Sequence, residues 1–282
     1  MPKSKLGICR ICGKKEKLTA EHSPPRSAFN SGRLLFRSID PYKTKKVTVW
    51  KTKIKQAGFS ELVLCEGCNK STAKWYVAEY TKLAEACSPH ARVANAEHSV
   101  TIQILTLFPL RVFKQVLAIM CATSNDEVND NWQAIGIEDK GFNFKLDISA
   151  ASGALKLIRA YVLDKEANGL PASFRLYAYL VGNRKGRKTG IVQLFSKSKK
   201  TSALFTEFSW FPLGWVLVFD GNIEDKLLGS KENKLLDITD WSKYKYDEEV
   251  AIDLEIPCHW VESNSPLDFR NPSLMKEVRA KN

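Results

Sequence analysis

Short runs of apolar residues alternate with polar ones over the first 65 residues, and this period of two predicts strands. The first run, "LTAEH", stops at Pro24-Pro25, because proline cannot continue a hydrogen-bonded ladder. Further runs are bounded by glycine or by basic residues. The pattern predicts strands at 18–22, 32–39, 45–55 and 58–65.

From residue 69 the apolar period lengthens to that of a helix. Trp75, Tyr80, Leu83 and Ala84 lie near helical spacing, which predicts a helix over 69–87 with one packing face. Apolar periodicity then weakens over 88–99, where we expect a boundary.

The remaining residues indicate a mostly antiparallel sheet with one or two helices. A buried amphipathic helix is expected from Pro109 to residue 125, because proline favours the first helical turn. The glycine-flanked basic stretch 182–190 is interpreted as a solvated hairpin tip. Strands are expected at 142–149, 174–182, 189–195, 203–211, 214–220 and 250–256. The fold class predicted is therefore α+β.

Length and charge divide the chain in two. A chain of 282 residues suits about two domains, which we place at 1–88 and 99–282. Residues 1–100 hold 19 Lys and Arg against 8 Asp and Glu, whereas residues 101–282 hold 24 against 23. A basic domain beside a neutral one indicates a polyanion partner. A membrane surface is disfavoured, because the basic residues are spread over loops and strands and not along one amphipathic helix.

Composition narrows the class of protein further. The chain is 44% hydrophobic and 26% charged, as in ordinary globular proteins. It has no run of about 18 apolar residues and no apolar signal-peptide core at its N-terminus. We therefore expect a cytoplasmic protein with no membrane partner.

Four of the seven cysteines form two Cys-x-x-Cys pairs, both in the basic third. Two such pairs can supply four thiolates to one tetrahedral zinc, which would be structural because a four-sulfur site is closed. A redox role is the alternative for a lone pair, but it requires a βαβ context that is absent. The zinc ligands predicted are Cys9, Cys12, Cys65 and Cys68, and the remaining cysteines are expected to pack as small apolar residues.

Glu21, His22 and Asn69 are placed to meet near this zinc. His22 ends the strand after the first pair, and Asn69 follows the second pair at the start of the helix. A zinc that joins the pairs would bring these ends together. Carboxylate and amide oxygens suit Mg²⁺ or Mn²⁺, and a neutral imidazole suits a general base.

The combination "CRICG", "TAEHSPP" and "LVLCEGCNKSTAKWY" resembles the HNH endonuclease family, in its subclass with a four-cysteine zinc. The resemblance covers residues 8 to about 80. It implies a ββα-metal fold in which His22 activates water for attack on a phosphodiester. It also implies that Glu21 and Asn69 hold a catalytic divalent metal.

The sequence departs from the family pattern before the second cysteine pair, where the family's middle Asn is replaced by Ser60 and Glu61. Asn30 is our candidate for that orienting role. The long cationic loop between residues 31 and 57 is expected to contact phosphate. The residues predicted to bind nucleic acid, double-stranded DNA above all, are Arg26, Arg33, Arg37, Lys45, Lys46, Lys51, Lys53, Lys70 and Lys74.

Two functions follow: a metal-dependent endonuclease, and a zinc module that binds nucleic acid without cutting it. For residues 99–282 the aromatic strands leave three alternatives open, namely plain core, a pocket for a small-molecule or protein regulator, and a homo-oligomer surface. Related nuclease domains are often fused to targeting or regulatory domains in anti-phage defence, restriction and mobile elements. By that analogy alone we expect a sensing or specificity role here.

Overall fold

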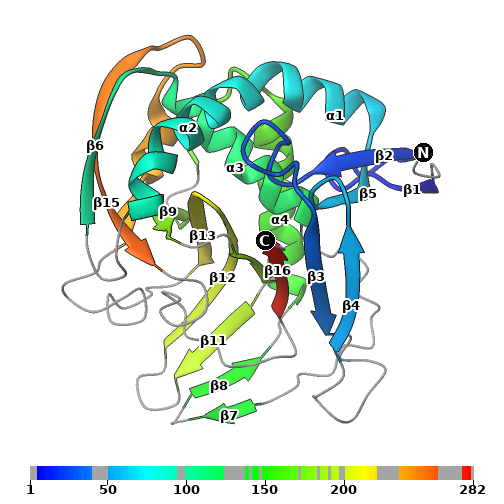
Figure 1. Cartoon of the computed structure of the whole chain (residues 1–282). Helices are drawn as coiled ribbons and strands as arrows, with labels where there is room; N and C mark the ends of the chain where they lie inside the picture. The colour runs from blue at the N-terminus through cyan, green and yellow to red at the C-terminus, as the bar shows by residue number, and fades with distance from the viewer. Residues whose placement is uncertain are drawn as a thin grey trace.

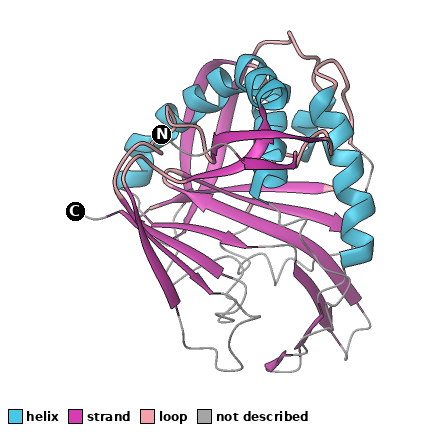
Figure 2. Ribbon diagram, turned by 90° about the vertical axis from the view of Figure 1, so that its right-hand side faces the viewer, coloured by secondary structure: helices cyan, strands magenta, loops and turns pink. Residues whose placement is uncertain are grey.

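The computed structural model describes residues 5–39, 50–93, 99–123, 137–139, 142–145, 148–170, 173–182, 185–189, 192–196, 201–220, 235–259 and 275–280. These residues form a mixed α+β structure with few helices and mostly antiparallel strand pairs. Figure 2 shows the helices gathered along the upper and right-hand sides of the strands. Among the described residues, no helix is both long and apolar enough to span a lipid bilayer.

A small three-stranded sheet, in the order β1-β2-β5, lies at the N-terminal end of the chain. It is formed by β1 (Lys5–Ile8), β2 (Lys15–His22) and β5 (Ser60–Cys65). Leu18 is buried at the centre of β2, and its side chain covers Gly7 so closely that a Cβ there would lie 2.7 Å from it. The strands predicted at 18–22 and 58–65 are thus present, with β2 starting earlier than expected.

One long helical segment follows β5 directly. It consists of α1 (Glu66–Thr72), the π-helical turn η1 (Ala73–Val77) and α2 (Ala78–Val93). Tyr80, Leu83 and Ala84 are buried, as their helical spacing predicts. The helix is longer than expected, because it continues through Pro89 to Val93.

The second sheet has the order β4-β3-β16-β10-β12-β13-β9-β15-β6. Along the chain its main strands are β3 (Leu34–Ile39), β4 (Trp50–Lys55), β6 (Ser99–Leu107), β9 (Arg175–Val181), β10 (Lys185–Thr189), β12 (Thr201–Trp210), β13 (Leu213–Asp220), β15 (Val250–His259) and β16 (Met275–Ala280). Short strands join it at β9 and β12, namely β7 (Ile137–Asp139), β8 (Phe142–Lys145), β11 (Val192–Ser196) and β14 (Leu236–Asp237). The pairing of β15 with β9 is parallel, whereas the other described pairings are antiparallel.

Two further helices cover this sheet, α3 (Pro109–Thr123) and α4 (Ile148–Leu163), together with the short 3-10 helix η2 (Thr239–Lys243). The helix α3 is buried along almost its whole length, so it forms the centre of the core. The strand expected at 142–149 is only partly present, because Ile148 already begins α4. The basic stretch 182–190 also differs from expectation: Lys185–Thr189 is the strand β10, held between β12 and β16, and not a solvated tip.

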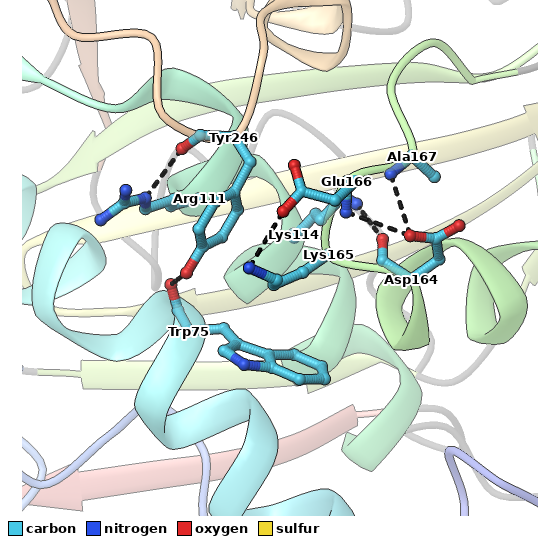
Figure 3. Close-up of polar contacts among 8 residues, drawn as sticks. All are labelled: Trp75, Arg111, Lys114, Asp164, Lys165, Glu166, Ala167 and Tyr246. Carbon is cyan, nitrogen blue, oxygen red and sulfur yellow. Dashed lines mark hydrogen bonds and ion pairs between the residues drawn. The ribbon is translucent and has the colours of Figure 1, made fainter.

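Two of the contacts that join the N-terminal elements to the rest involve β3 and the π-helical turn η1. Figure 1 shows the C-terminal strand β16 beside β3, and Leu35 of β3 is the register partner of Arg279. The second join is the π-turn, where the carbonyl of Trp75 accepts a hydrogen bond from the hydroxyl of Tyr246 at 3.2 Å. The Tyr246 ring lies between the guanidinium of Arg111 and the ammonium of Lys165, at 4.3 and 4.8 Å (Figure 3). The division at residues 88–99 stays a prediction.

Candidate metal and nuclease site

The first cysteine pair is held in a tight turn next to β5. The amide of Gly13 donates to the carbonyl of Cys9 at 2.9 Å, and Gly13 has a φ of +72°, which favours glycine. The amide of Arg10 donates to the carbonyl of Val63 at 3.0 Å. The second pair lies where β5 becomes α1, because Cys65 ends the strand and Cys68 is in the first helical turn. Local turns therefore bring the two pairs together.

The four sulfur atoms of Cys9, Cys12, Cys65 and Cys68 lie within 4.8 Å of one another. The sulfurs of Cys12 and Cys65 are 3.8 Å apart. A tetrahedral zinc with bonds of about 2.3 Å separates its sulfurs by about 3.8 Å, so the cluster fits this metal. A hydrogen bond with Cys68 lowers the pKa of Cys9 to about 4, which favours the thiolate that binds metal. The predicted zinc ligands therefore form one cluster compatible with a structural zinc.

His22 is the last residue of β2, opposite Ser60 of β5. Its Nε2 lies 3.1 Å from the carbonyl oxygen of Ala57. A carbonyl can only accept a hydrogen bond, so Nε2 carries the proton and the neutral ring keeps a lone pair on Nδ1. This contact fixes both the tautomer and the orientation of the imidazole.

The surroundings of His22 favour its neutral form. Burial lowers the pKa of His22 below its usual value, and the positive charges of Arg26 and Lys55 lower it further, while the bond to Ala57 acts in the opposite direction. A neutral imidazole at neutral pH is the form that accepts a proton from water.

Asn30 shapes the two chain segments on either side of His22. It is fully buried, and its Nδ2 donates to the carbonyls of Pro24 and Phe59 at 2.6 and 2.9 Å. Its Oδ1 accepts from the amide of Phe59 at 2.6 Å. Among the described residues, no hydrogen bond joins Asn30 to His22. Asn30 joins the chain just after His22 to the chain just after Ala57, and so fixes how these two segments approach each other.

Gly58 allows this clamp to form. Its φ is +81°, and a Cβ there would lie 2.0 Å from the backbone oxygen of Asn30 and 2.6 Å from its Oδ1. The amide of Gly58 also donates to the carbonyl of Gly32 at 2.8 Å. Only glycine fits here, and the position fixes the carbonyl of the preceding Ala57.

Asn69, on α1, reaches back to the strand that carries Glu21 and His22. Its Nδ2 donates to the hydroxyl of Thr19 at 3.0 Å and to the carbonyl of Ala20 at 3.3 Å. The register of β2 against β5 shifts between Thr19 and Ala20, and such irregularities open a ladder to a side chain. Because Nδ2 of Asn69 donates these two hydrogen bonds, a metal bound by this amide would be bound through Oδ1.

Glu21 is the electrostatically unusual carboxylate of the site. It is half-buried, and its carboxylate has no hydrogen bond or ion pair within the part of the chain that the structure describes. Burial raises its pKa to about 8. A carboxylate desolvated without a partner is suited to a cation, because a cation would offset the cost of burying its charge.

Not all the predicted residues meet directly. Of the described residues, Glu21, His22 and Asn69 form no hydrogen bond with one another, although Asn69 contacts the residue just before Glu21. The structure thus places Glu21 and His22 at the end of β2 and brings the Asn69 amide to the backbone just before them.

The predicted nucleic-acid contacts are scattered around this site. Arg26, Arg33, Lys70 and Lys74 are exposed, and Lys70 forms an ion pair of 2.5 Å with Glu66. The others fall on the cationic hairpin, where Arg37 is in β3, Lys51 and Lys53 are in β4, and Lys45 and Lys46 lie outside the described residues.

Sequence reasoning missed two groups that organise the site, the carbonyl of Ala57 and Gly58. A backbone carbonyl leaves no mark in a sequence. The glycine was visible between two strands, but its contact with Asn30 was not. The remaining cysteines, Cys87, Cys121 and Cys258, are buried as expected.

Comparisons of the chain with protein-family models, with curated proteins and with solved structures find no match.

Proposed function

We propose that this protein is a metal-dependent endonuclease of the HNH type, which hydrolyses phosphodiester bonds in nucleic acid and most readily in DNA. The observation that carries the proposal is the hydrogen bond between His22 Nε2 and the Ala57 carbonyl at 3.1 Å. It leaves Nδ1 as the basic atom of a histidine whose pKa is lowered, and the preceding residue, Glu21, has a half-buried carboxylate with no partner among the described residues.

In this mechanism Nδ1 of His22 accepts a proton from water as the water oxygen attacks phosphorus. The Ala57 carbonyl stabilises the protonated ring that results. A divalent cation held by the Glu21 carboxylate and by Oδ1 of Asn69 would stabilise the charge that develops on the phosphate and on the leaving oxygen. Asn30 and Gly58 hold the Ala57 carbonyl in place, and the four-cysteine cluster holds β2 against α1.

The positive charges near His22 indicate the class of substrate. Arg26 and Lys55 stand close enough to His22 to lower its pKa, and Arg33 is exposed nearby in the chain. Cations around a base and a carboxylate favour a polyanionic substrate over a neutral one. A regulatory role for residues 99–282, in anti-phage defence or a mobile element, stays a prediction by analogy.

The decisive experiment incubates the zinc-loaded protein with supercoiled plasmid in Mg²⁺, in Mn²⁺ and in EDTA. The proposal predicts nicked or linear DNA in the presence of either metal and none in EDTA. The competing function, a zinc protein that binds nucleic acid without cutting it, predicts retarded but intact supercoiled DNA in all three. Intact plasmid over a wide range of enzyme concentration would decide for that second function.

A further inference from the structure

The helix that carries Asn69 changes its winding just beyond this residue. The helix α1 ends at Thr72, the π-helical turn η1 spans Ala73–Val77, and α2 continues from Ala78. A π-turn within a helix is rare, because it breaks the regular i→i+4 ladder. One residue more in a turn rotates the preceding helix by about 100° relative to the following one. The turn therefore determines in which direction α1 presents Asn69.

Two hydrogen bonds join this π-turn to distant parts of the chain. The hydroxyl of Tyr246 donates to the carbonyl of Trp75 at 3.2 Å, and the hydroxyl of Tyr76 donates to the carbonyl of Val162, near the end of α4, at 2.7 Å. Tyr76 is buried, and its ring lies edge-on to that of Tyr246 with centroids 6.5 Å apart. The turn is thus anchored from outside through its backbone and through a side chain.

Tyr246 is itself held in a tight turn and between two cations. The amide of Lys245 donates to the Glu248 carboxylate at 2.9 Å, and the amide of Glu248 donates to the carbonyl of Lys245 at 3.2 Å. Arg111 of α3 donates from Nε to the Tyr246 carbonyl at 2.8 Å, and its guanidinium lies 4.3 Å from the Tyr246 ring (Figure 3). The ammonium of Lys165 lies 4.8 Å from the same ring. We call Tyr246, Arg111 and Lys165 the Tyr246 clasp.

The loop that follows α4 fixes one side of the clasp. Lys165 forms an ion pair of 2.9 Å with Glu166. The carboxylate of Asp164 accepts from the amides of Glu166 and Ala167 at 3.1 and 3.2 Å (Figure 3). The buried Lys114 of α3 donates to the carbonyl of Asp164. The helix α3 and this loop therefore form one support for the clasp.

The other end of α1 is held by the cysteine cluster. The helix α1 has only seven residues, and a helix of that length is marginal on its own. Cys68, in its first turn, contributes a sulfur to the cluster, while the clasp holds the turn that follows Thr72. Asn69 lies between these two attachments. Its bonds of 3.0 and 3.3 Å to Thr19 and Ala20 cross from α1 to β2, so they depend on how α1 is oriented.

We propose that the Tyr246 clasp positions Asn69: by holding the π-turn, it orients α1 so that the Asn69 amide meets the end of β2. The inference rests on the proposed function only where it assigns Asn69 to a metal, and the positioning itself is independent of that role. It gives residues 99–282 a defined task in the candidate nuclease site. It also implies that residues 1–88 alone do not hold this site in its observed arrangement.

The test removes a single hydroxyl from the zinc-loaded full chain. Tyr246→Phe deletes the bond to the Trp75 carbonyl and keeps the ring between the two cations. The matched control is Tyr244→Phe, two residues away, because the Tyr244 hydroxyl forms no hydrogen bond within the described ranges. The position of Asn69 is read by NMR from the solvent exchange of its side-chain NH₂ group, which its bonds to β2 slow.

We expect this exchange to be about three- to tenfold faster in Tyr246→Phe, as the net loss of one hydrogen bond predicts. The affinity for Mn²⁺, measured by EPR, should fall by a similar factor. Tyr244→Phe should leave both unchanged, and both variants should keep their zinc, because the cysteine cluster holds its own end of α1. A Tyr246→Phe variant that melts at a lower temperature but keeps the exchange rate of wild type would overturn the inference.

A second variant covers the case in which Tyr246→Phe yields too little folded protein. Arg111→Lys keeps a cation beside the ring but loses the Nε donor to the Tyr246 carbonyl, and it should change the exchange of the Asn69 NH₂ group in the same direction. An unchanged exchange rate there also contradicts the positioning role. Wild-type protein that binds no Mn²⁺ would refute the metal role of Asn69, whereas the exchange measurement would still decide whether the clasp positions it.

Discussion

At the scale of single residues, the orientation of His22 depends on groups that do not touch Nδ1, the nitrogen proposed to act as the base. The Ala57 carbonyl binds Nε2, while Asn30 and Gly58 fix the chain that carries this carbonyl. The sequence could suggest His22, because a histidine beside Glu21 and between two cysteine pairs is specific. The sequence suggested Asn30 only because this residue lies in the loop that follows His22. Its three hydrogen bonds depend on how residues 24 and 59 approach each other, which is tertiary structure.

Asn30→Ala should test this positioning role. The substitution leaves two carbonyls and one amide without their side-chain partner, and we expect a loss of about 2–4 kcal/mol in the free energy of unfolding. If Asn30 positions the Ala57 carbonyl, the pKa of His22 measured by NMR should also shift, and Asn30→Asp, which keeps Oδ1, should restore part of the stability. A destabilised variant with an unchanged His22 pKa would limit Asn30 to a structural role.

The raised pKa of Glu21 predicts the direction in which the stability of the protein changes with pH. Its pKa is raised to about 8 in the folded protein, from an ordinary value near 4.5, so the folded state binds more protons between these values. Without added divalent metal, stability should therefore fall as pH rises from about 5 to 8, by at most about 1.4 kcal/mol per pH unit. Glu21→Gln should remove this slope, as should saturating Mn²⁺ in the wild-type protein. Denaturant titrations at several pH values check it, and identical slopes in Glu21→Gln and wild type would argue against this assignment.

At the scale of elements, local patterns were sufficient where a strand or helix is determined by its own residues. The run ending at Pro24 and the helical stripe of Tyr80 and Leu83 are examples. Local patterns failed for β10, because "KGRKT" has no apolar alternation and is a strand only through its neighbours β12 and β16. They also missed the π-turn at Trp75, whose carbonyl is satisfied by Tyr246, 171 residues away.

Because the four-cysteine cluster links several elements, we expect the stability of those elements to depend on bound zinc. It holds the first turn, the end of β5 and the start of α1, and few apolar residues could replace it in so small a sheet. We expect one zinc per chain by elemental analysis, and a strong chelator should lower the melting temperature by several degrees or more. Cys68→Ser should lose the zinc and the same stability, whereas the matched variant Cys121→Ser, outside the cluster, should keep the metal. Full zinc content in Cys68→Ser would contradict the ligand assignment.

At the scale of the whole molecule, the N-terminal elements pair and pack with elements from the rest of the chain. The strand β16 inserts between β3 and β10, and Arg10 donates a hydrogen bond to the carbonyl of Ala122, at 2.5 Å, at the end of α3. No sequence pattern links the last residues of the chain to the cationic hairpin, since the pairing joins segments more than 200 residues apart. The strands at the two ends of the chain therefore belong to one sheet.

One measurement tests whether His22 is the base of a metal-dependent nuclease. Single-turnover cleavage of a duplex in Mn²⁺ is compared for wild type and His22→Ala, at matched zinc content, melting temperature and DNA affinity. We expect the variant to cut more slowly by a factor of about 10²–10⁴, the usual contribution of a general base. A variant that cuts as fast as wild type, with zinc and DNA binding intact, would contradict it.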